Sequence, residues 1–276
     1  MKGTASSRCA RAAILAATAA ALSAVALSGA GCGPPPPPPP LVDGVTDRTA
    51  AALVAGLEAR RQSLDTVRAG LEITWDDPRF AEPENCRGSL SFTSPDSLRL
   101  RGHSAAFFTV FDLVAAGSDV WLDVPREGFT VFGPRRDQAW ARLPLSPHAL
   151  LVALLAHPCP GGDCLADARI ERVSGELFLR GAFGRLGLDL ATGLPVRFEG
   201  EGEDPLRIAW IEWSERSGVA WPQTIVIERS RGQRLTVSFG RVQLGRPVQP
   251  SRFERGEDPS REILTPAEAA RRWATR

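Results

Sequence analysis

The stretch from Arg87 to Phe132 constrains the fold most, because its apolar residues repeat with the period of β-strands. Leu98-Arg99-Leu100-Arg101 alternates strictly, and Thr109–Val114 and Val120–Val124 are longer apolar runs. Residues that favour tight bends separate these runs at Pro95-Asp96, Gly117-Ser118-Asp119 and Pro125-Arg126-Glu127-Gly128. Period-two patterning with such boundaries predicts a meander of antiparallel strands.

The second half of the chain returns to the same pattern. It predicts further strands at Arg169–Val173, Glu176–Ala182, Leu186–Asp189, Val196–Glu201, Arg207–Trp213, Thr224–Glu228 and Leu235–Leu244. Together the two halves predict one sheet of about eleven to thirteen strands, and an antiparallel sheet this wide curls.

Three helices are expected around this sheet. Thr46–Ala69 has apolar residues near helical spacing and leads directly into a strand at Gly70–Trp75. Thr265 and Glu268 form a capping-box pattern that predicts a short final helix. The fold class is therefore α+β, with one large curved antiparallel sheet and helices against its concave face.

The third expected helix is almost wholly apolar. Ser146 and Pro147 suit the N-cap and first position, and Ala149–Ala156 follows. At about 10 residues it is too short to cross a bilayer. A helix that is apolar all round is buried, either as an ordinary core helix or as a lid on an apolar cavity, with shallow membrane insertion as a third alternative.

The N-terminus has the pattern of an export signal over residues 1–31, with Lys2, Arg8 and Arg11 before an apolar segment. Cys32 follows small residues and resembles the lipidated cysteine of a bacterial lipobox, which would carry palmitate-type acyl chains; ordinary cleavage before Cys32 is the alternative. Gly33 after the cysteine favours an outer-membrane lipoprotein that faces the periplasm. Residues 32–44 also hold Pro34–Pro40, a polyproline II spacer or a linker of no special length.

Cys159 and Cys164 flank a short loop after the apolar helix. An exported protein meets an oxidising compartment, so the pair is expected to form a disulfide, with a bond from Cys86 to one of them as the alternative. His157 with these two cysteines does not match a familiar zinc spacing, and no metal site is predicted.

The sequence indicates no catalytic residue and no cofactor. Gly102-His103-Ser104-Ala105-Ala106 resembles a nucleophile elbow, but the alternation of strands and helices that a serine hydrolase needs is missing. Asp76-Asp77 is interpreted as a solvated loop, and no phosphate-binding loop is present. A formal net charge of +1 argues against binding to nucleic acid.

Three segments resemble motifs of the periplasmic lipoprotein-carrier superfamily of LolA-like and LolB-like proteins. Ser94–Gly102 is similar to its P-x-x-L-R-L-x-G strand, and Phe111–Pro125 to its F-D-L…G-x-x-x-W-x-x-x-P hairpin. Val219–Phe253 is similar to its closing P-x-x-I…L-x-L…F strands. The resemblance is strongest to uncharacterised outer-membrane lipoproteins of that fold.

The resemblance implies a half-open β-barrel over residues 45–255, followed by a C-terminal tail with a short helix over residues 256–276. It also implies a cavity that takes up lipid or lipoprotein acyl chains, which need only burial from water. The cavity candidates are Leu98, Leu100, Phe111, Leu113, Trp121, Leu150, Leu151, Leu154 and Leu155. The alternative is a non-catalytic structural or assembly lipoprotein of the envelope that acts through a protein partner.

Overall fold

The structure is a computed structural model that describes residues 49–79, 81–143, 145–160, 164–202, 205–229, 232–256 and 258–275. These residues belong to one compact unit within Pro35–Arg276. The expectations for the signal segment, for Cys32 and for Pro34–Pro40 lie outside the described residues.

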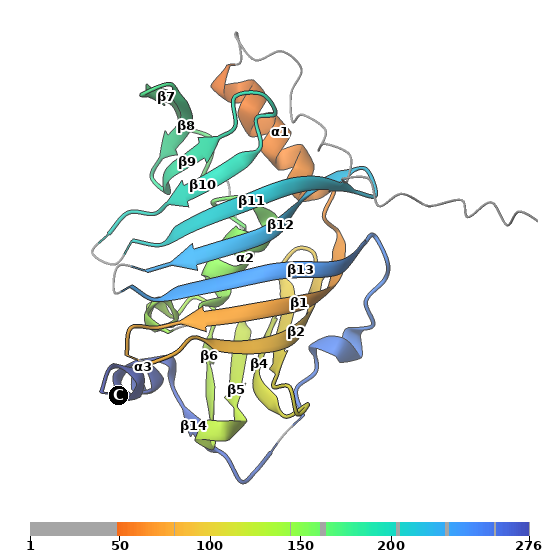
Figure 1. The fold of residues 1–276 in the computed structure, drawn as a ribbon, viewed down its shortest axis with the longest axis vertical. Helices are drawn as coiled ribbons and strands as arrows, with labels where there is room; N and C mark the ends of the chain where they lie inside the picture. Colours follow the sequence, from red (N-terminus) through yellow and green to blue (C-terminus); the bar gives the residue numbers. More distant parts are fainter. Residues whose placement is uncertain are drawn as a thin grey trace, which may run out of the picture. The chain divides into compact units, whose positions relative to one another are not determined.

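The described residues form one open sheet of fourteen strands in the order β14-β6-β5-β4-β3-β2-β1-β13-β12-β11-β10-β9-β8-β7 (Figure 1). All neighbouring pairs are antiparallel except β14 with β6. The strands are β1 (Thr66–Asp76), β2 (Glu84–Thr93), β3 (Ser97–His103), β4 (Thr109–Ala116), β5 (Asp119–Val124), β6 (Phe129–Pro134), β7 (Arg169–Val173), β8 (Glu176–Gly181), β9 (Gly184–Leu188), β10 (Pro195–Glu199), β11 (Arg207–Arg216), β12 (Val219–Glu228), β13 (Arg234–Leu244) and β14 (Glu262–Leu264). The sheet is not closed, which makes it the half-open barrel that the sequence predicts.

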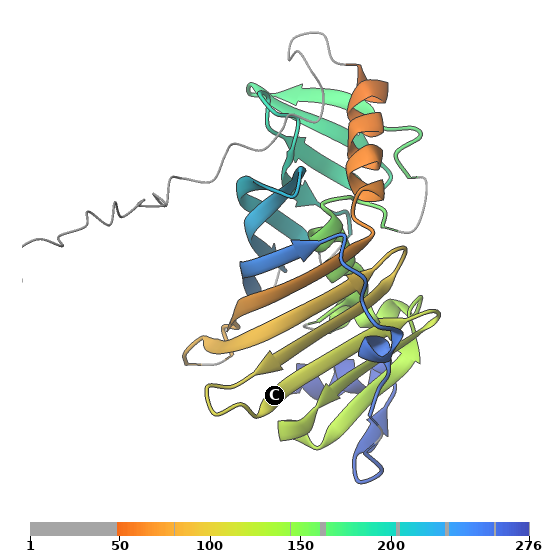
Figure 2. The same cartoon turned by 90° about the vertical axis from the view of Figure 1, so that its right-hand side faces the viewer.

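Three α-helices accompany the sheet, each begun by a hydroxyl cap. They are α1 (Ala50–Gln62), α2 (Pro147–Leu155) and α3 (Pro266–Ala274), with the 3-10 turns η1 (Pro125–Glu127), η2 (Gln138–Arg142) and η3 (Pro250–Phe253). Thr49, Ser146 and Thr265 are the caps, and Thr265 forms the expected capping box with Glu268. Figure 2 shows α1 beside the sheet, where its Arg60 contacts β11 and β12.

The first helix is shorter than the sequence predicts. It ends at Gln62 instead of Ala69, and β1 begins at Thr66 instead of Gly70. Ser63 ends the helix, because its hydroxyl donates to the Arg60 carbonyl 2.7 Å away. Beyond it, Val67 and Ala69 are buried at alternating positions of a strand.

The C-terminal segment is part of the sheet. Its residues Glu262–Leu264 form β14, which pairs with β6 and brings the number of strands to fourteen. The α3 helix packs against β6 and η2, and Trp273 contacts Phe129 edge to face at 5.4 Å. The expected tail therefore completes one end of the same core.

Both faces of β4 are buried. Phe111 and Leu113 face the core, whereas Asp112 lies on the outer face under Arg99 and Arg101, with Asp112 Oδ2 2.6 Å from Arg99 Nη2. Arg99 Nη1 also donates to the Arg252 carbonyl at 2.8 Å, which fixes η3 on this face. Among the described residues, no helix is long and apolar enough to cross a membrane.

Candidate functional site

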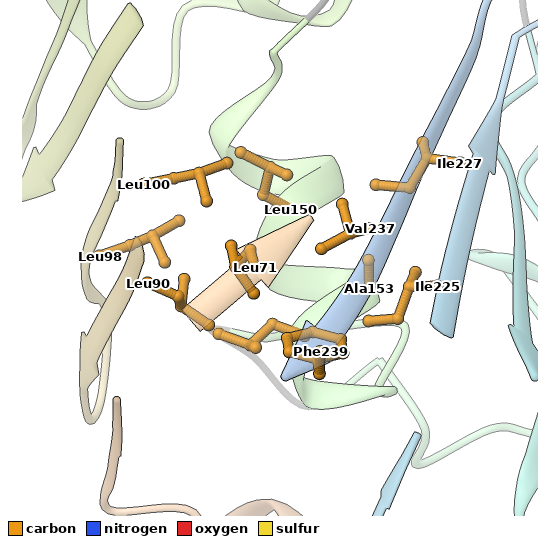
Figure 3. A pocket seen from close by; sticks show the side chains of 11 residues that line it. Leu71, Leu90, Leu98, Leu100, Leu150, Ala153, Ile225, Ile227, Val237 and Phe239 are labelled. Carbon is orange, nitrogen blue, oxygen red and sulfur yellow. The ribbon is translucent and has the colours of Figure 1, made fainter. Parts of the chain in front are cut away.

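An apolar cavity lies between α2 and the inner face of the central strands (Figure 3). Five strands supply its wall, and the side chains shown in Figure 3 converge on α2. Eleven residues line it: Leu71, Leu90, Leu98, Leu100, Leu150, Ala153, Leu154, Ile225, Ile227, Val237 and Phe239. No charged or polar side chain is among them, so the cavity can recognise an apolar chain only through burial.

The α2 helix covers this cavity because its sequence leaves it no polar face. Ser146 Oγ caps the Ala149 amide at 3.4 Å, and Pro147 takes the first turn. Every residue from Ala149 to Leu155 is buried. Leu150 and Leu154 line the cavity, while Leu151 and Leu155 are buried elsewhere in the same core.

The cavity is nearly filled by its own lining, with a free volume of about 30 Å³. This is the space of about one water molecule, whereas pockets for small ligands have about 300–1,000 Å³. A ligand larger than a water molecule therefore requires the lining to move apart.

Two polar contacts hold α2 in place through its backbone. Trp210 Nε1, on β11, donates to the Ala153 carbonyl at 2.7 Å. Arg60 on α1 donates through Nη1 to the Leu155 carbonyl and through Nε to the Ala220 carbonyl on β12 at 3.3 Å. The C-terminal end of α2 is thus attached to β11 and to α1, and Arg60 joins α1 in turn to β12.

Arg60 is only 5% exposed and lies over the ring of Trp213, 4.9 Å from its centroid. Burial lowers its pKa to about 9, so the guanidinium remains charged at neutral pH. Among the described residues it forms no ion pair with a carboxylate.

A second contact between the helices lies just beyond α2. His157 is fully buried, and its Nε2 is 3.1 Å from Glu58 Oε1 on α1. Burial lowers the pKa of His157, and its Nδ1 lies beside the Cys159 backbone, 3.2 Å from the amide nitrogen and 3.1 Å from the carbonyl oxygen. Cys159 is bonded to Cys164, the disulfide expected from the sequence, and Cys86 is free.

The structure brings together part of the predicted cavity set. Leu98, Leu100, Leu150 and Leu154 line the cavity, whereas Phe111, Leu113, Leu151 and Leu155 pack in the surrounding core. Trp121 lies elsewhere: it is partly exposed and stacks on Phe132 at 5.1 Å, and its neighbours Val120 and Leu122 are the buried residues of β5.

Sequence reasoning missed the wall of the cavity on β1, β2, β12 and β13. Leu71, Leu90, Ile225, Ile227, Val237 and Phe239 complete it. Strict alternation in Leu235-Thr236-Val237-Ser238-Phe239 was a usable signal for one inner face. Which strands stand opposite α2 depends on the sheet order, and the sequence does not give that order.

Two further residues considered for chemistry have structural contacts. Ser104 lies in the β3–β4 loop, where its Oγ accepts a hydrogen bond from the Phe108 amide at 3.3 Å. His157 contacts Glu58 on α1 and the Cys159 backbone just beyond α2. Within the part of the chain that the structure describes, no three His, Cys, Asp or Glu side chains gather as a metal site.

The β3–β4 loop also carries the two most exposed large apolar side chains of the described residues. Phe107 is 87% and Phe108 is 74% exposed. Two adjacent exposed aromatic rings make this loop a candidate contact surface for a membrane or a protein.

Comparisons with known proteins find likeness in structure but not in sequence. No family model and no curated protein sequence matches the chain. A solved LolA superfamily protein from Nitrosomonas europaea is 14% identical, with a TM-score of 0.51 over 76% of this chain and 99% of its own. A putative outer-membrane lipoprotein-sorting protein domain from Vibrio parahaemolyticus is 11% identical, with a TM-score of 0.52 over 74% of this chain and 95% of its own. A protein of the family DUF1329 from Desulfovibrio piger is 12% identical, with a TM-score of 0.52 over 76% of this chain and 98% of its own.

Proposed function

We propose that this chain, whose fold is LolA-like, is a non-enzymatic lipoprotein of the bacterial envelope that binds lipid or lipoprotein acyl chains in its half-barrel. The observation that carries this proposal is the cavity under α2, whose lining is apolar throughout. The likeness to a solved lipoprotein-sorting domain supports it. The proposed anchor is an acylated Cys32, joined to the domain by the proline-rich linker and placed in the outer membrane facing the periplasm.

In this proposal α2 acts as a lid. Lifting it exposes leucine side chains whose burial stabilises the closed state by about 1.5–3 kcal/mol each. An entering acyl chain restores apolar contact at about 0.8 kcal/mol per buried CH₂ group. Lifting α2 therefore costs free energy in the empty protein. Binding of a sufficiently long acyl chain offsets that cost.

The exposed Phe107 and Phe108 fit the same function. A loop tip that inserts aromatic rings into the interfacial region would bring the domain to the lipid surface from which a chain is taken or to which it is given. Arg87, which lies opposite His103 at the end of β3, is exposed beside this loop and suits anionic lipid.

The test uses the full-length chain with Cys32→Ser, which removes the proposed acylation site, purified from a bacterial periplasm. Native mass spectrometry with organic extraction should find a bound acyl-chain species. Leu154→Asp should abolish its binding, because a carboxylate in the apolar lining opposes burial of the chain. Ala153→Val, which narrows the cavity with less disturbance of the fold, should weaken it.

Leu190→Asp is the matched control, since Leu190 is 41% exposed and does not line the cavity. It should leave lipid binding unchanged. An empty wild-type protein that also takes up no fluorescent fatty-acid probe would refute the proposal.

The second candidate is a structural or assembly lipoprotein of the envelope that acts through a protein partner. The free volume of only about 30 Å³ favours it, because a cavity this small can be a filled core. Recovery of one stoichiometric partner protein with a lipid-free chain would support this candidate over the first.

A further inference from the structure

Two buried hydrogen-bond donors close to residues that line the cavity have no acceptor among the described residues. Arg60 Nη2 and Trp221 Nε1 are both withdrawn from water without a hydrogen-bond partner among the described residues. A guanidinium and an indole N–H can only donate. Leaving such groups unpaired inside a protein is costly, above all for the charged one.

Both donors adjoin the cavity through their neighbours. Trp221 packs edge to face on Phe239, with ring centroids 5.1 Å apart, and Phe239 lines the cavity. Arg60 is bonded to the carbonyl of Ala220, the residue before Trp221. It is also bonded to the carbonyl of Leu155, the residue after the cavity-lining Leu154.

The charge of Arg60 is not offset by the acidic residue on its own helix. Glu58 contacts Arg61 at 2.8 Å and His157 at 3.1 Å instead. Within the part of the chain that the structure describes, the guanidinium contacts two carbonyl oxygens and the Trp213 ring. An apolar cavity thus lies near a buried positive charge for which the described residues supply no counter-ion.

We propose that Arg60 and Trp221 form the receptor for an anionic headgroup, and that the ligand is an amphiphile whose carboxylate or phosphate is joined to an acyl chain. The inference rests on the proposed function, since the chain part of the ligand occupies the cavity under α2. Movement of α2 carries the Leu155 carbonyl away from Arg60 and frees a second donor, Nη1, for the headgroup. The neutral acyl groups of a lipoprotein do not supply this counter-charge, so the site selects an anionic lipid over them.

The test compares three ligands with the same 16-carbon chain: hexadecanoate, hexadecyl phosphate and hexadecanol. The protein is the full-length chain with Cys32→Ser, and affinity is measured by competition with a fluorescent fatty-acid probe at pH 7. At least one anion should bind about tenfold or more tightly than the alcohol, the size expected for one charge-assisted hydrogen bond. The tighter anion identifies the headgroup.

Arg60→Met removes the charge and keeps much of the volume, and it should bring the ratio of anion to alcohol affinity to about one. The ratio is the readout because loss of the contact with the Leu155 carbonyl also eases movement of α2 and changes the affinity for all three ligands alike. Trp221→Phe keeps an aromatic ring but removes the N–H, so it should disturb the fold less than Arg60→Met does. It should lower the ratio of anion to alcohol affinity. Arg68→Met, at an exposed arginine of β1, is the control and should keep the full ratio.

Equal affinity for the alcohol and both anions in the unsubstituted protein would overturn the headgroup receptor and leave the acyl-chain function standing. A preference that survives in both Arg60→Met and Trp221→Phe would overturn it as well. Failure of all three ligands to bind would remove the proposed function together with the inference.

Discussion

Asp77 is a single carboxylate in the β1–β2 loop that links this loop to the β12–β13 loop at the ends of the central strands. Arg79 donates to it from Nε at 2.9 Å and from Nη2 at 2.6 Å, and Gln233 Nε2 donates from the β12–β13 loop at 2.9 Å. Arg79 also reaches the Trp273 carbonyl at the end of α3. The carboxylate therefore holds together segments that are far apart in the chain.

These donors lower the pKa of Asp77 from 3.8 to about 2, chiefly through the Arg79 side chain. The folded state then binds this proton less readily than the unfolded state does. The stabilisation is full above about pH 4 and is lost as the pH falls toward 2. At neutral pH the shift corresponds to about 2 kcal/mol.

Asp77→Asn should consequently lower the free energy of unfolding by about 2 kcal/mol at pH 7 and by much less at pH 2. Urea unfolding at a series of pH values measures both. Asp76→Asn is the control, because Asp76 is the exposed neighbour and should change stability little. A difference between Asp77→Asn and the unsubstituted chain that stays constant from pH 7 to pH 2 would contradict the assignment.

The sequence alone did not distinguish these two aspartates. Both stand in a polar loop and were expected to be solvated, yet Asp77 is 2% exposed. The difference arises from Gln233 and Trp273, which come from distant parts of the chain. Contacts of this kind depend on the register of the whole sheet, and local pattern carries no information about them.

At the scale of elements, strands were predictable wherever one face is buried and the other is not. The alternation in β3 and β13 follows that rule. Strand prediction failed at the start of β1. Leu64 and Val67 are three residues apart there, a spacing that fits a helix as well as a strand. It also gave no direction for Trp121, because β5 has apolar residues on both faces.

The β3–β4 loop has a role that can be tested separately from the cavity. Replacing Phe107 and Phe108 by Ser together should lower binding to vesicles of phosphatidylethanolamine and phosphatidylglycerol by about tenfold or more, since two aromatic side chains lose their burial in lipid. Thermal unfolding should change little, because both rings are exposed. Vesicle co-sedimentation of the Cys32→Ser chain measures the effect.

Ile263→Ser is the control for this pair, since Ile263 is 62% exposed on β14 and lies outside the loop. Equal loss of vesicle binding in the control and in the double variant would show that general surface hydrophobicity, and not the loop, governs membrane contact.

At the scale of the whole molecule, the C-terminal segment decides whether one end of the core is covered. Leu264 and Ala269 are buried, and Trp273 shields Phe129, which is 1% exposed. The sequence predicted the capped helix correctly but gave β14 no strand signal, because three residues are too few for a repeating pattern.

A chain that ends at Gly256 should therefore lose about 5 kcal/mol or more of stability, since several apolar side chains become exposed at about 1.5–3 kcal/mol each. Differential scanning calorimetry should show a clearly lower midpoint, whereas a chain that ends at Ala274 should unfold like the full-length protein. An unchanged midpoint of thermal unfolding in the shorter chain would mean that the C-terminal segment does not contribute to the stability of the core.

The pairing of β1 with β13 has a consequence for how the chain reaches this structure. Hairpins connect most neighbouring strands, but Trp75 lies opposite Leu235, about 160 residues later in the sequence. Local hairpins close quickly, while a contact of such high sequence separation must first overcome the entropy of a long loop. As the chain is synthesised from its N-terminus onward, β1 cannot pair with β13 until almost the whole chain has emerged. Joining the two meanders at this seam is therefore expected to be the slow step of folding, and the edge of β1 is the surface that needs protection until then.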